Sequence, residues 1–310
     1  RPTEETYRGE RFKDFNYDVK GNNDLLNLTQ PDMILDIHRE YLEAGSDMIE
    51  TNTFNSNTVS QVDYGMVDLV YELNVAGARL ARQAADEYTL KTPDKPRFVG
   101  GSIGPTTKAA SFSRDVDNPG FREVTFDEVV DNYRDSIRGL LDGGSDVLIL
   151  ETITDTLNAK AALFALKEYE ETQGVDVPII ISGTIIDRSG RNMPGQDVES
   201  LWYSIRHAKP LAFGLNCAFG GEELRPFIAE ISALVDTHVV AYPNAGLPNE
   251  MGEFDEPPET TVGHISDYIN SGFVNIVGGC CGTSPDHIRA MAEALEQNST
   301  PRKIPTLPPY

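Results

Sequence analysis

Seven short apolar runs, rich in β-branched residues, recur along the chain, and each ends in small or polar residues. A run that is apolar on both faces is typical of a strand in a parallel sheet that helices cover. The runs are "DMIETNTF" (47–54), "RFVGGSIGPT" (97–106), "DVLILETITD" (146–155), "PIIISGTIID" (178–187), "LAFGLNCAFG" (211–220), "HVVAYPNAG" (238–246) and "FVNIVGGCCG" (273–282). The pattern therefore predicts seven parallel strands.

Between these runs, and after the last one, apolar residues recur at intervals of three and four, which is the period of a helix with one buried face. Starts such as Ser284, followed by Pro285 and Asp286, resemble helix N-caps. The predicted helices span 31–45, 69–88, 126–144, 156–171, 198–208, 222–235, 264–272 and 285–297. Strands and helices alternate, so the sequence predicts an α/β protein built from repeated βα units.

Repeated βα units over this length favour a (β/α)8 barrel of the TIM type, spanning residues 1–297. A doubly wound open sheet is the structural alternative, but no G-x-G-x-x-G motif follows the first run. Only seven strands are found, and the helix at 31–45 has no strand before it. We therefore expect the first strand to lie upstream of Arg1, the chain to be part of a longer protein, and the Pro-rich tail 298–310 to be a linker.

The charge balance restricts the partners of the protein. The chain has 49 acidic and 26 basic residues and a formal net charge of -23. Such a surface repels phosphate groups, which argues against binding to nucleic acid or to anionic membranes. No apolar run approaches the roughly 18 residues of a membrane span, and the polar start "RPTEETYRGERFKDF" is unlike a signal peptide. With only three cysteines we expect no disulfide framework and a reducing, cytoplasmic location.

Polar residues at the carboxyl ends of barrel strands are the usual catalytic candidates. Here all three cysteines of the chain occupy such ends, as do several carboxylates and amides. The candidates are Glu50, Asn52, Ser102, Glu151, Asp155, Asp187, Asn216, Cys217, Asn244, Cys280 and Cys281. Among the histidines only His238 belongs to a strand, and it stands at the opposite end. The pattern therefore indicates a site in which sulfur is the metal ligand.

The spacing of the cysteines predicts that they meet. With the missing strand counted as the first, Cys217 ends the sixth strand and Cys280 the eighth, and alternate strands share one interior layer. Three thiolates in an open cavity are the ligand set of a zinc ion with one vacant position. Glycines at 278, 279 and 282 would let the backbone bend so that Cys281 also reaches the ion. A buried apolar role for Cys217 and a disulfide within the adjacent pair are the alternatives.

Ligation by sulfur alone has a chemical consequence. A zinc ion with three thiolates carries a net charge of about -1, which suits holding a fourth thiolate better than activating water. A free thiol with a pKa of about 8.5 is only about 3% ionised at pH 7, whereas metal coordination removes its proton. The expected reaction is attack by a substrate thiolate on an alkyl carbon, with Cys217, Cys280 and Cys281 as both ligands and catalytic residues.

A substrate that is an amino acid also needs a carboxylate to hold its ammonium group. Glu151 is the best placed, because its strand shares the parity of the cysteine strands. Glu50 and Asp187 are second choices. Acidic residues at strand ends often cap the following helix instead, and Asp155, directly before the helix at 156–171, fits that role best.

These residues together resemble the zinc-dependent homocysteine S-methyltransferase family. Its zinc signature matches "GLNC" followed some sixty residues later by "NIVGGCCG". The finer resemblance is to the homocysteine module of cobalamin-dependent methionine synthases, from Arg1 to about residue 296. The segments that carry it are "KGNNDLL" (20–26), "IETNTFNS" (49–56), "ETITDTLNAKAALFALK" (151–167), "ISGTIID" (181–187), "YPNAGLPN" (242–249) and "GGCCGTSPDHI" (278–288).

The resemblance implies that Cys217, Cys280 and Cys281 bind Zn²⁺, that Glu151 holds the homocysteine amino group, and that Asn244 approaches zinc when substrate is absent. It implies methylcobalamin, carried on another module, as the methyl donor, and folate-, cobalamin- and activation-domains after the tail. The chain begins just after the family's Asp-Gly motif, which contributes to binding of the substrate carboxylate.

Other functions stay open at this point. A related zinc enzyme could take its methyl group from betaine or S-methylmethionine. A Mg²⁺-dependent lyase or aldolase of the TIM-barrel type could use Glu50, Glu151 and Asp187, although no lysine ends a strand as a Schiff-base aldolase would require. A zinc-binding module without catalytic activity is a further alternative, which an open three-ligand site disfavours.

Overall fold

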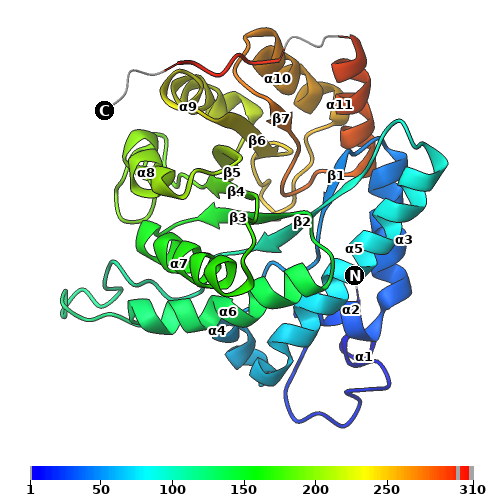
Figure 1. Ribbon diagram of the computed structural model, residues 1–310, viewed down its shortest axis with the longest axis vertical. Helices are drawn as coiled ribbons and strands as arrows, with labels where there is room; N and C mark the ends of the chain where they lie inside the picture. The colour runs from blue at the N-terminus through cyan, green and yellow to red at the C-terminus, as the bar shows by residue number, and fades with distance from the viewer. Residues whose placement is uncertain (1, 298–300, 307–310) are drawn as a thin grey trace. The chain divides into compact units, whose positions relative to one another are not determined.

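A computed structural model describes residues 2–297 and 301–306 of the chain. The chain divides into two compact units, each with its own contacts. The first comprises Arg1–Glu43, Asp47–Leu150 and Leu157–Pro178, and the second comprises Ala44–Ser46, Glu151–Thr156 and Ile179–Tyr310. Figure 1 labels the elements of both units.

The first unit holds three parallel strands with helices around them. In register, Ile49 of the first strand pairs with Val99 of the second, and Ser102 of the second pairs with Ile149 of the third. The long helix α5 packs against both α3 and α6. The elements are α1 (Glu4–Arg8), η1 (Asn23–Leu25), α2 (Leu26–Thr29), α3 (Pro31–Glu43), β1 (Met48–Glu50), α4 (Thr58–Gln61), η2 (Val62–Tyr64), η3 (Val67–Leu69), α5 (Val70–Lys91), β2 (Phe98–Ile103), α6 (Phe126–Asp142), β3 (Val147–Ile153) and α7 (Thr156–Gln173).

The second unit begins with the end of β3 and continues with four parallel strands in chain order. The N–H of Thr184 donates to the carbonyl of Ile153, so β4 follows β3, and β5, β6 and β7 pair in turn. The elements are β4 (Ile179–Gly183), α8 (Val198–Ile205), η4 (Arg206–Ala208), β5 (Ala212–Gly220), α9 (Gly221–Leu234), β6 (His238–Asn244), α10 (Pro258–Asn270), β7 (Ile276–Val277) and α11 (Pro285–Gln297). The carboxyl ends of these strands therefore share one edge.

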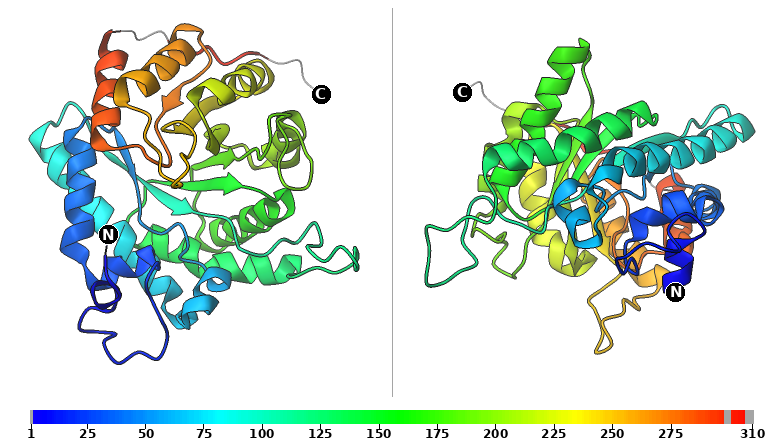
Figure 2. Two further views of the ribbon diagram at one scale, coloured as in Figure 1. Left: turned by 180° about the vertical axis from the view of Figure 1, so that it is seen from behind. Right: turned by 90° about the horizontal axis from the view of Figure 1, so that it is seen from below.

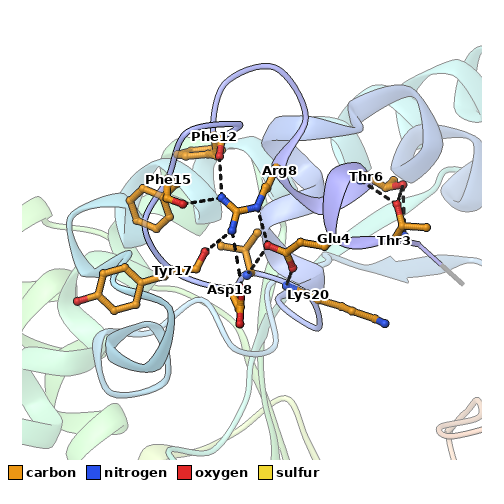
Figure 3. Close-up of polar contacts among 10 residues, drawn as sticks. Thr3, Glu4, Thr6, Arg8, Phe12, Phe15, Tyr17, Asp18 and Lys20 are labelled. Atoms are coloured by element: carbon orange, nitrogen blue, oxygen red, sulfur yellow. Dashed lines mark hydrogen bonds and ion pairs between the residues drawn. The ribbon is translucent and has the colours of Figure 1, made fainter.

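The segment before α3 is ordered by charged side chains instead of by a strand (Figure 3). The guanidinium of Arg8 donates to the carbonyls of Phe15 and Tyr17, at 2.6 and 2.8 Å, and Glu4 accepts from the N–H of Lys20 at 2.7 Å. These bonds tie the loop 9–20 to the first helix. The absence of a strand from residues 2–30, expected from the sequence, is confirmed.

The seven predicted strands and eight predicted helices are present among the described residues. Helix α6 begins where Thr125 and Glu128 form a capping box, and α8 begins at the N-cap Asp197. Helix α10 starts at Pro258, six residues before the predicted start, because proline is well tolerated in a first helical turn and the polar "ETT" that follows hides the apolar period. An eighth strand is not seen in the part of the chain that the structure describes.

A long loop of residues 104–125 separates β2 from α6 in the first unit, and Figure 2 shows it, in teal, extending away from the helices. Val116 in this loop is 94% exposed. Across the described residues, no helix has the length and apolar character needed to cross a membrane.

Part of the tail that the sequence analysis assigns to a linker packs against the second unit. Residues 298–300 and 307–310 of that tail lie outside the described residues, but Arg302 is only 5% exposed. Its guanidinium donates to the carbonyls of Ser232, Val235 and Thr237, with distances of 2.7 to 3.1 Å. Two of these carbonyls belong to the carboxyl end of α9, where a cation also complements the helix dipole.

Replacing Arg302 by alanine is expected to lower the free energy of unfolding by about 3 kcal/mol, because several buried carbonyls lose their donor together. Lys303→Ala is the matched control, since it removes the same charge at an exposed neighbour. Chemical denaturation of the two variants measures the difference. Equal midpoints for both would show that the Arg302 contacts contribute nothing.

Candidate metal centre

The structure brings the three cysteines together in the second unit, as the strand parity predicted. Their sulfur atoms all lie within 4.8 Å of one another, and the Sγ atoms of Cys217 and Cys281 are 3.9 Å apart. All three are free thiols, and none is fully buried. A disulfide within the adjacent pair, one of the alternatives from the sequence, is therefore not formed.

A bulge at the end of β5 presents Cys217. Asn216 pairs with Tyr242 and Gly220 with Asn244, so three residues of β5 lie opposite the single residue Pro243 of β6. The extra length is taken up by Cys217 and Ala218, which have φ values of 62° and 61°. Left-handed backbone at a residue with a side chain costs about 1 kcal/mol or more, and such strain is concentrated at functional sites. The bulge therefore gives Cys217 a backbone conformation that a regularly paired strand does not have.

The Cys280–Cys281 loop follows the edge of β6 through backbone bonds. The N–H of Cys280 donates to the carbonyl of Pro243 at 2.8 Å, and the N–H of Ala245 donates to the carbonyl of Cys281 at 2.9 Å. Gly282 turns the chain after the pair with a φ of 79°. Hydrogen bonding to β6 thus fixes both cysteines, although β7 itself is only two residues long.

Glycine is needed at two of the three positions singled out in the sequence. Gly282 has left-handed backbone, and a Cβ at Gly279 would lie 2.0 Å from the hydroxyl oxygen of Thr283. A Cβ at Gly278 would make only an ordinary contact, 3.5 Å from the Cβ of Tyr242. The bend around the cysteine pair therefore depends on Gly279 and Gly282.

Hydrogen bonding within the cluster gives the three thiols different pKa values. Bonds from Cys280 and Cys281 lower the pKa of Cys217 to about 3. The bonds that Cys280 makes to Cys217 and Cys281, together with its burial, raise the pKa of the Cys280 thiol. The Cys217 sulfur likewise raises the pKa of Cys281. The cluster by itself thus favours one thiolate, at Cys217, and disfavours further negative charge beside it.

The geometry fits a zinc ion. Zn–S bonds of about 2.3 Å at tetrahedral angles place two sulfurs about 3.8 Å apart, which is close to the 3.9 Å between Cys217 and Cys281. Sulfur is a ligand that zinc accepts readily, and a divalent cation offsets the charge that three thiolates would concentrate at one point. Three protein ligands leave a fourth position for a substrate atom.

The remaining predicted site residues of the second unit differ in their surroundings. Glu151, near the end of β3, is 4% exposed, and Asn244, at the end of β6, is 2% exposed. The side-chain oxygen of Asn244 accepts from the N–H of Cys281 at 3.1 Å. Asp187 is exposed, and its carboxylate accepts from the N–H and hydroxyl of Ser189, which lowers its pKa. The carboxylate of Asp187 therefore stabilises the turn in which it lies.

Glu50 lies at the end of β1 in the first unit. The residue is exposed, while desolvation of its carboxyl group raises its pKa to about 7. A carboxyl group of this kind is a reasonable candidate for a functional residue. Its assignment to the substrate stays a prediction.

Two residues next to the cluster were not singled out by the sequence analysis. Thr152 has a φ of 54°, and both its N–H and its hydroxyl bond to the side chain of Asn216. Ser182 donates its hydroxyl to the same side chain at 2.7 Å. Both residues lie near the carboxyl ends of strands. Their position in the runs "LILETI" and "IIISG" was therefore the only feature of the sequence that could have indicated them.

The fold and the cluster define a class of protein: a parallel α/β protein with three thiols open to a metal ion at the carboxyl ends of its strands. A comparison with known families matches residues 3–295 to the homocysteine S-methyltransferase family. The chain belongs to this family.

Several solved structures share the fold of this chain. In its metallated form, the homocysteine methyltransferase MmuM from Escherichia coli is 22% identical, with a TM-score of 0.70 and 86% of each chain covered. Its oxidised form gives 20% identity, a TM-score of 0.70 and the same coverage. Its apo form gives 20% identity and a TM-score of 0.65, over 89% of this chain and 90% of the other. At this level of identity the likeness establishes the fold.

Proposed function

We propose that the chain is the homocysteine module of a cobalamin-dependent methionine synthase, in which a zinc site prepares homocysteine to accept a methyl group. The observation that carries the proposal is the convergence of the only three cysteines on one point at the strand ends. Membership of the homocysteine S-methyltransferase family supports the substrate. The seven parallel strands, most of them followed by a helix, support a (β/α)8 barrel whose eighth strand lies outside the described residues.

Cys217, Cys280 and Cys281 would hold the zinc ion. Zinc bound there would remove the proton of the homocysteine thiol and keep the sulfur nucleophilic. The bulge at Cys217 and the β6 hydrogen bonds of the Cys280–Cys281 loop hold the three sulfurs before metal or substrate arrives, so little reorganisation is needed.

Two further residues would position the substrate. The buried carboxylate of Glu151 would pair with the ammonium group of homocysteine, and in a partly dehydrated site such a charge pair is strong. Asn244 already bonds to the backbone of Cys281, so its amide lies beside the metal ligands and is suited to move aside when the substrate sulfur arrives. Glu50 is the second carboxylate that we assign to substrate binding.

The transfer itself needs no general acid from the chain. Methylcobalamin would supply the methyl group, and because cobalt would keep the electron pair of the bond that breaks as the homocysteine sulfur forms its new C–S bond, no proton would have to be delivered to a leaving group. We place the cobalamin on another module of the same enzyme, with folate- and activation-domains, and the protein in the cytoplasm, where its three free thiols would stay reduced. The tail beyond residue 297 would lead to the folate-binding module.

A second donor class has one observation in its favour. The match to the homocysteine methyltransferase MmuM covers 86% of the MmuM chain. A homocysteine methyltransferase of similar length to this chain therefore exists. A small methylated cation, either S-methylmethionine or betaine, could then be the donor. Family membership favours methyl transfer, from methylcobalamin or from a methylated cation, over the reaction of a Mg²⁺-dependent lyase.

One experiment tests the function and separates the donors. The reduced chain is loaded with zinc, its metal content is measured with and without homocysteine, and it is then given methylcobalamin, S-methylmethionine or betaine. We expect about one zinc per chain and methionine from methylcobalamin. Methionine formed only from a methylated cation would replace the donor proposed here. A folded, reduced chain that takes up no zinc would overturn the proposal.

A further inference from the structure

The side chain of Asn216 is completely buried, and all of its hydrogen-bonding capacity is used. Its oxygen accepts from the N–H of Thr152 at 3.0 Å and from the hydroxyl of Ser182 at 2.7 Å. Its nitrogen donates to the hydroxyl oxygen of Thr152 at 2.8 Å and to the Sγ of Cys280 at 3.9 Å. A side-chain amide has two acceptor and two donor positions, so none is left over.

These partners allow only one orientation of the amide. Rotation by 180° would turn the NH₂ group toward the N–H of Thr152, which can only donate, and would bring the oxygen to the sulfur of Cys280. Two donors would then face each other in a buried place, at a cost of the order of a lost hydrogen bond. Because the N–H of Thr152 belongs to the backbone, it cannot turn away. An N–H group is thus held toward the Cys280 sulfur.

We propose that Asn216 is a positioning residue for the metal centre: its N–H group, fixed by the bonds to Thr152 and Ser182, orients the sulfur of Cys280 toward the ion. Hydrogen bonds to ligand atoms fix their orientation and commonly set metal affinity. The inference rests on the zinc site of the proposed function. It adds a residue that touches neither the ion nor the substrate and acts through Cys280.

The same side chain connects the metal ligands to the strand end that carries Glu151. Asn216 precedes Cys217 in the chain, and Thr152 follows Glu151. Thr152 is held at a φ of 54° with both its N–H and its hydroxyl bonded to Asn216. A β-branched residue adopts this backbone only when its surroundings impose it. Asn216 therefore also fixes the backbone next to the carboxylate that we assign to the homocysteine ammonium group.

Asn216→Asp tests the proposal, because it keeps the shape of the side chain and replaces the donor beside Cys280 by an acceptor. Ser182→Ala is the matched control, since it removes a bond of the same network without touching sulfur. For both variants and the unchanged 310-residue chain, zinc affinity is measured by competition with a chromophoric chelator. The sulfur-to-metal charge-transfer band is recorded after loading with Co²⁺, and thermal unfolding of the metal-free protein reports on the fold.

We expect Asn216→Asp to weaken zinc binding about 10- to 100-fold and to shift the charge-transfer band, as loss of a bond to a ligand does. Ser182→Ala should lower the melting temperature and leave affinity and band unchanged. Equal zinc affinity in Asn216→Asp and the unchanged chain would overturn the inference, and so would equal losses in both variants. If Asn216→Asp does not fold, Asn216→Ser, which removes the donor without adding charge, is subject to the same criteria. Failure of the unchanged chain to bind zinc would instead count against the proposed function.

Discussion

Replacing Cys217 by serine is expected to reduce bound zinc from about one ion per chain to near zero and methyl transfer to homocysteine by at least about 10³-fold. A serine hydroxyl does not ionise at neutral pH, so the centre would lose one of its three anionic ligands. Without the metal the homocysteine thiol is only about 3% ionised at pH 7 and is no longer held near the donor. Metal analysis and methionine formation, measured on the same sample, check the result.

Ala218→Gly is the control for the Cys217 variant. It changes the neighbouring residue, which has the same left-handed backbone with a φ of 61°, and glycine adopts that backbone without strain. Zinc content should stay near one per chain. Undiminished activity in Cys217→Ser would contradict the three-sulfur site. Loss of zinc in both variants would show that the conformation of the bulge, and not the Cys217 sulfur itself, is required.

Glu151→Gln is expected to raise the KM for homocysteine about 10- to 100-fold while zinc content stays the same. Glutamine keeps the size of the buried side chain but removes the charge that would pair with the substrate ammonium group, and hydrogen bonds to charged groups contribute about 1.5–3 kcal/mol. If the ammonium contact is equally strong in ground state and transition state, kcat changes little. Initial rates over a range of homocysteine concentrations separate the two constants.

Asp187→Asn is the matched control for that measurement. It removes one negative charge at the end of another strand run, where the carboxylate bonds to its own turn through Ser189. KM should be nearly unchanged in this variant. A rise in KM of the same size in both would mean that overall charge, and not a contact with Glu151, governs binding of homocysteine.

Most of the fold could be predicted because its signals are local. Strands such as β3 and β4 are continuous apolar runs, and helices such as α6 show a clear apolar period, so their existence follows from burial alone. The short helices α1, α2 and α4 escaped prediction because elements of four or five residues hold too few apolar positions to show a period. The ordering of residues 9–20 depends on Arg8 and Glu4, whose bonds reach across the loop to backbone atoms.

At the site, the convergence of the three cysteines was predictable, but the surroundings that hold them were not. Strand parity brought Cys217 and Cys280 to one layer, because that argument needs only the order of the strands. The left-handed backbone at Cys217 lies in a bulge against β6, and that at Thr152 is held by the side chain of Asn216, so neither has a local signal. The role of Asn216 depends on the four atoms of Thr152, Ser182 and Cys280 that bond to its side chain. Composition and spacing carry no information about these contacts.

The separation of the three cysteines along the chain would link metal uptake at the proposed site to folding. Cys217 and Cys281 are 64 positions apart, with α9, β6, α10 and β7 between them, whereas Cys280 and Cys281 are adjacent. An unfolded chain therefore offers an ion only a two-sulfur site, and the third sulfur arrives when β5, β6 and β7 have paired. An ion that binds the native chain more tightly than the denatured one raises the free energy of unfolding by mass action. With zinc bound at the proposed site, the ion would act as a folding ligand for this unit, and a fall in zinc supply would lower the free energy of unfolding as well as the proposed activity.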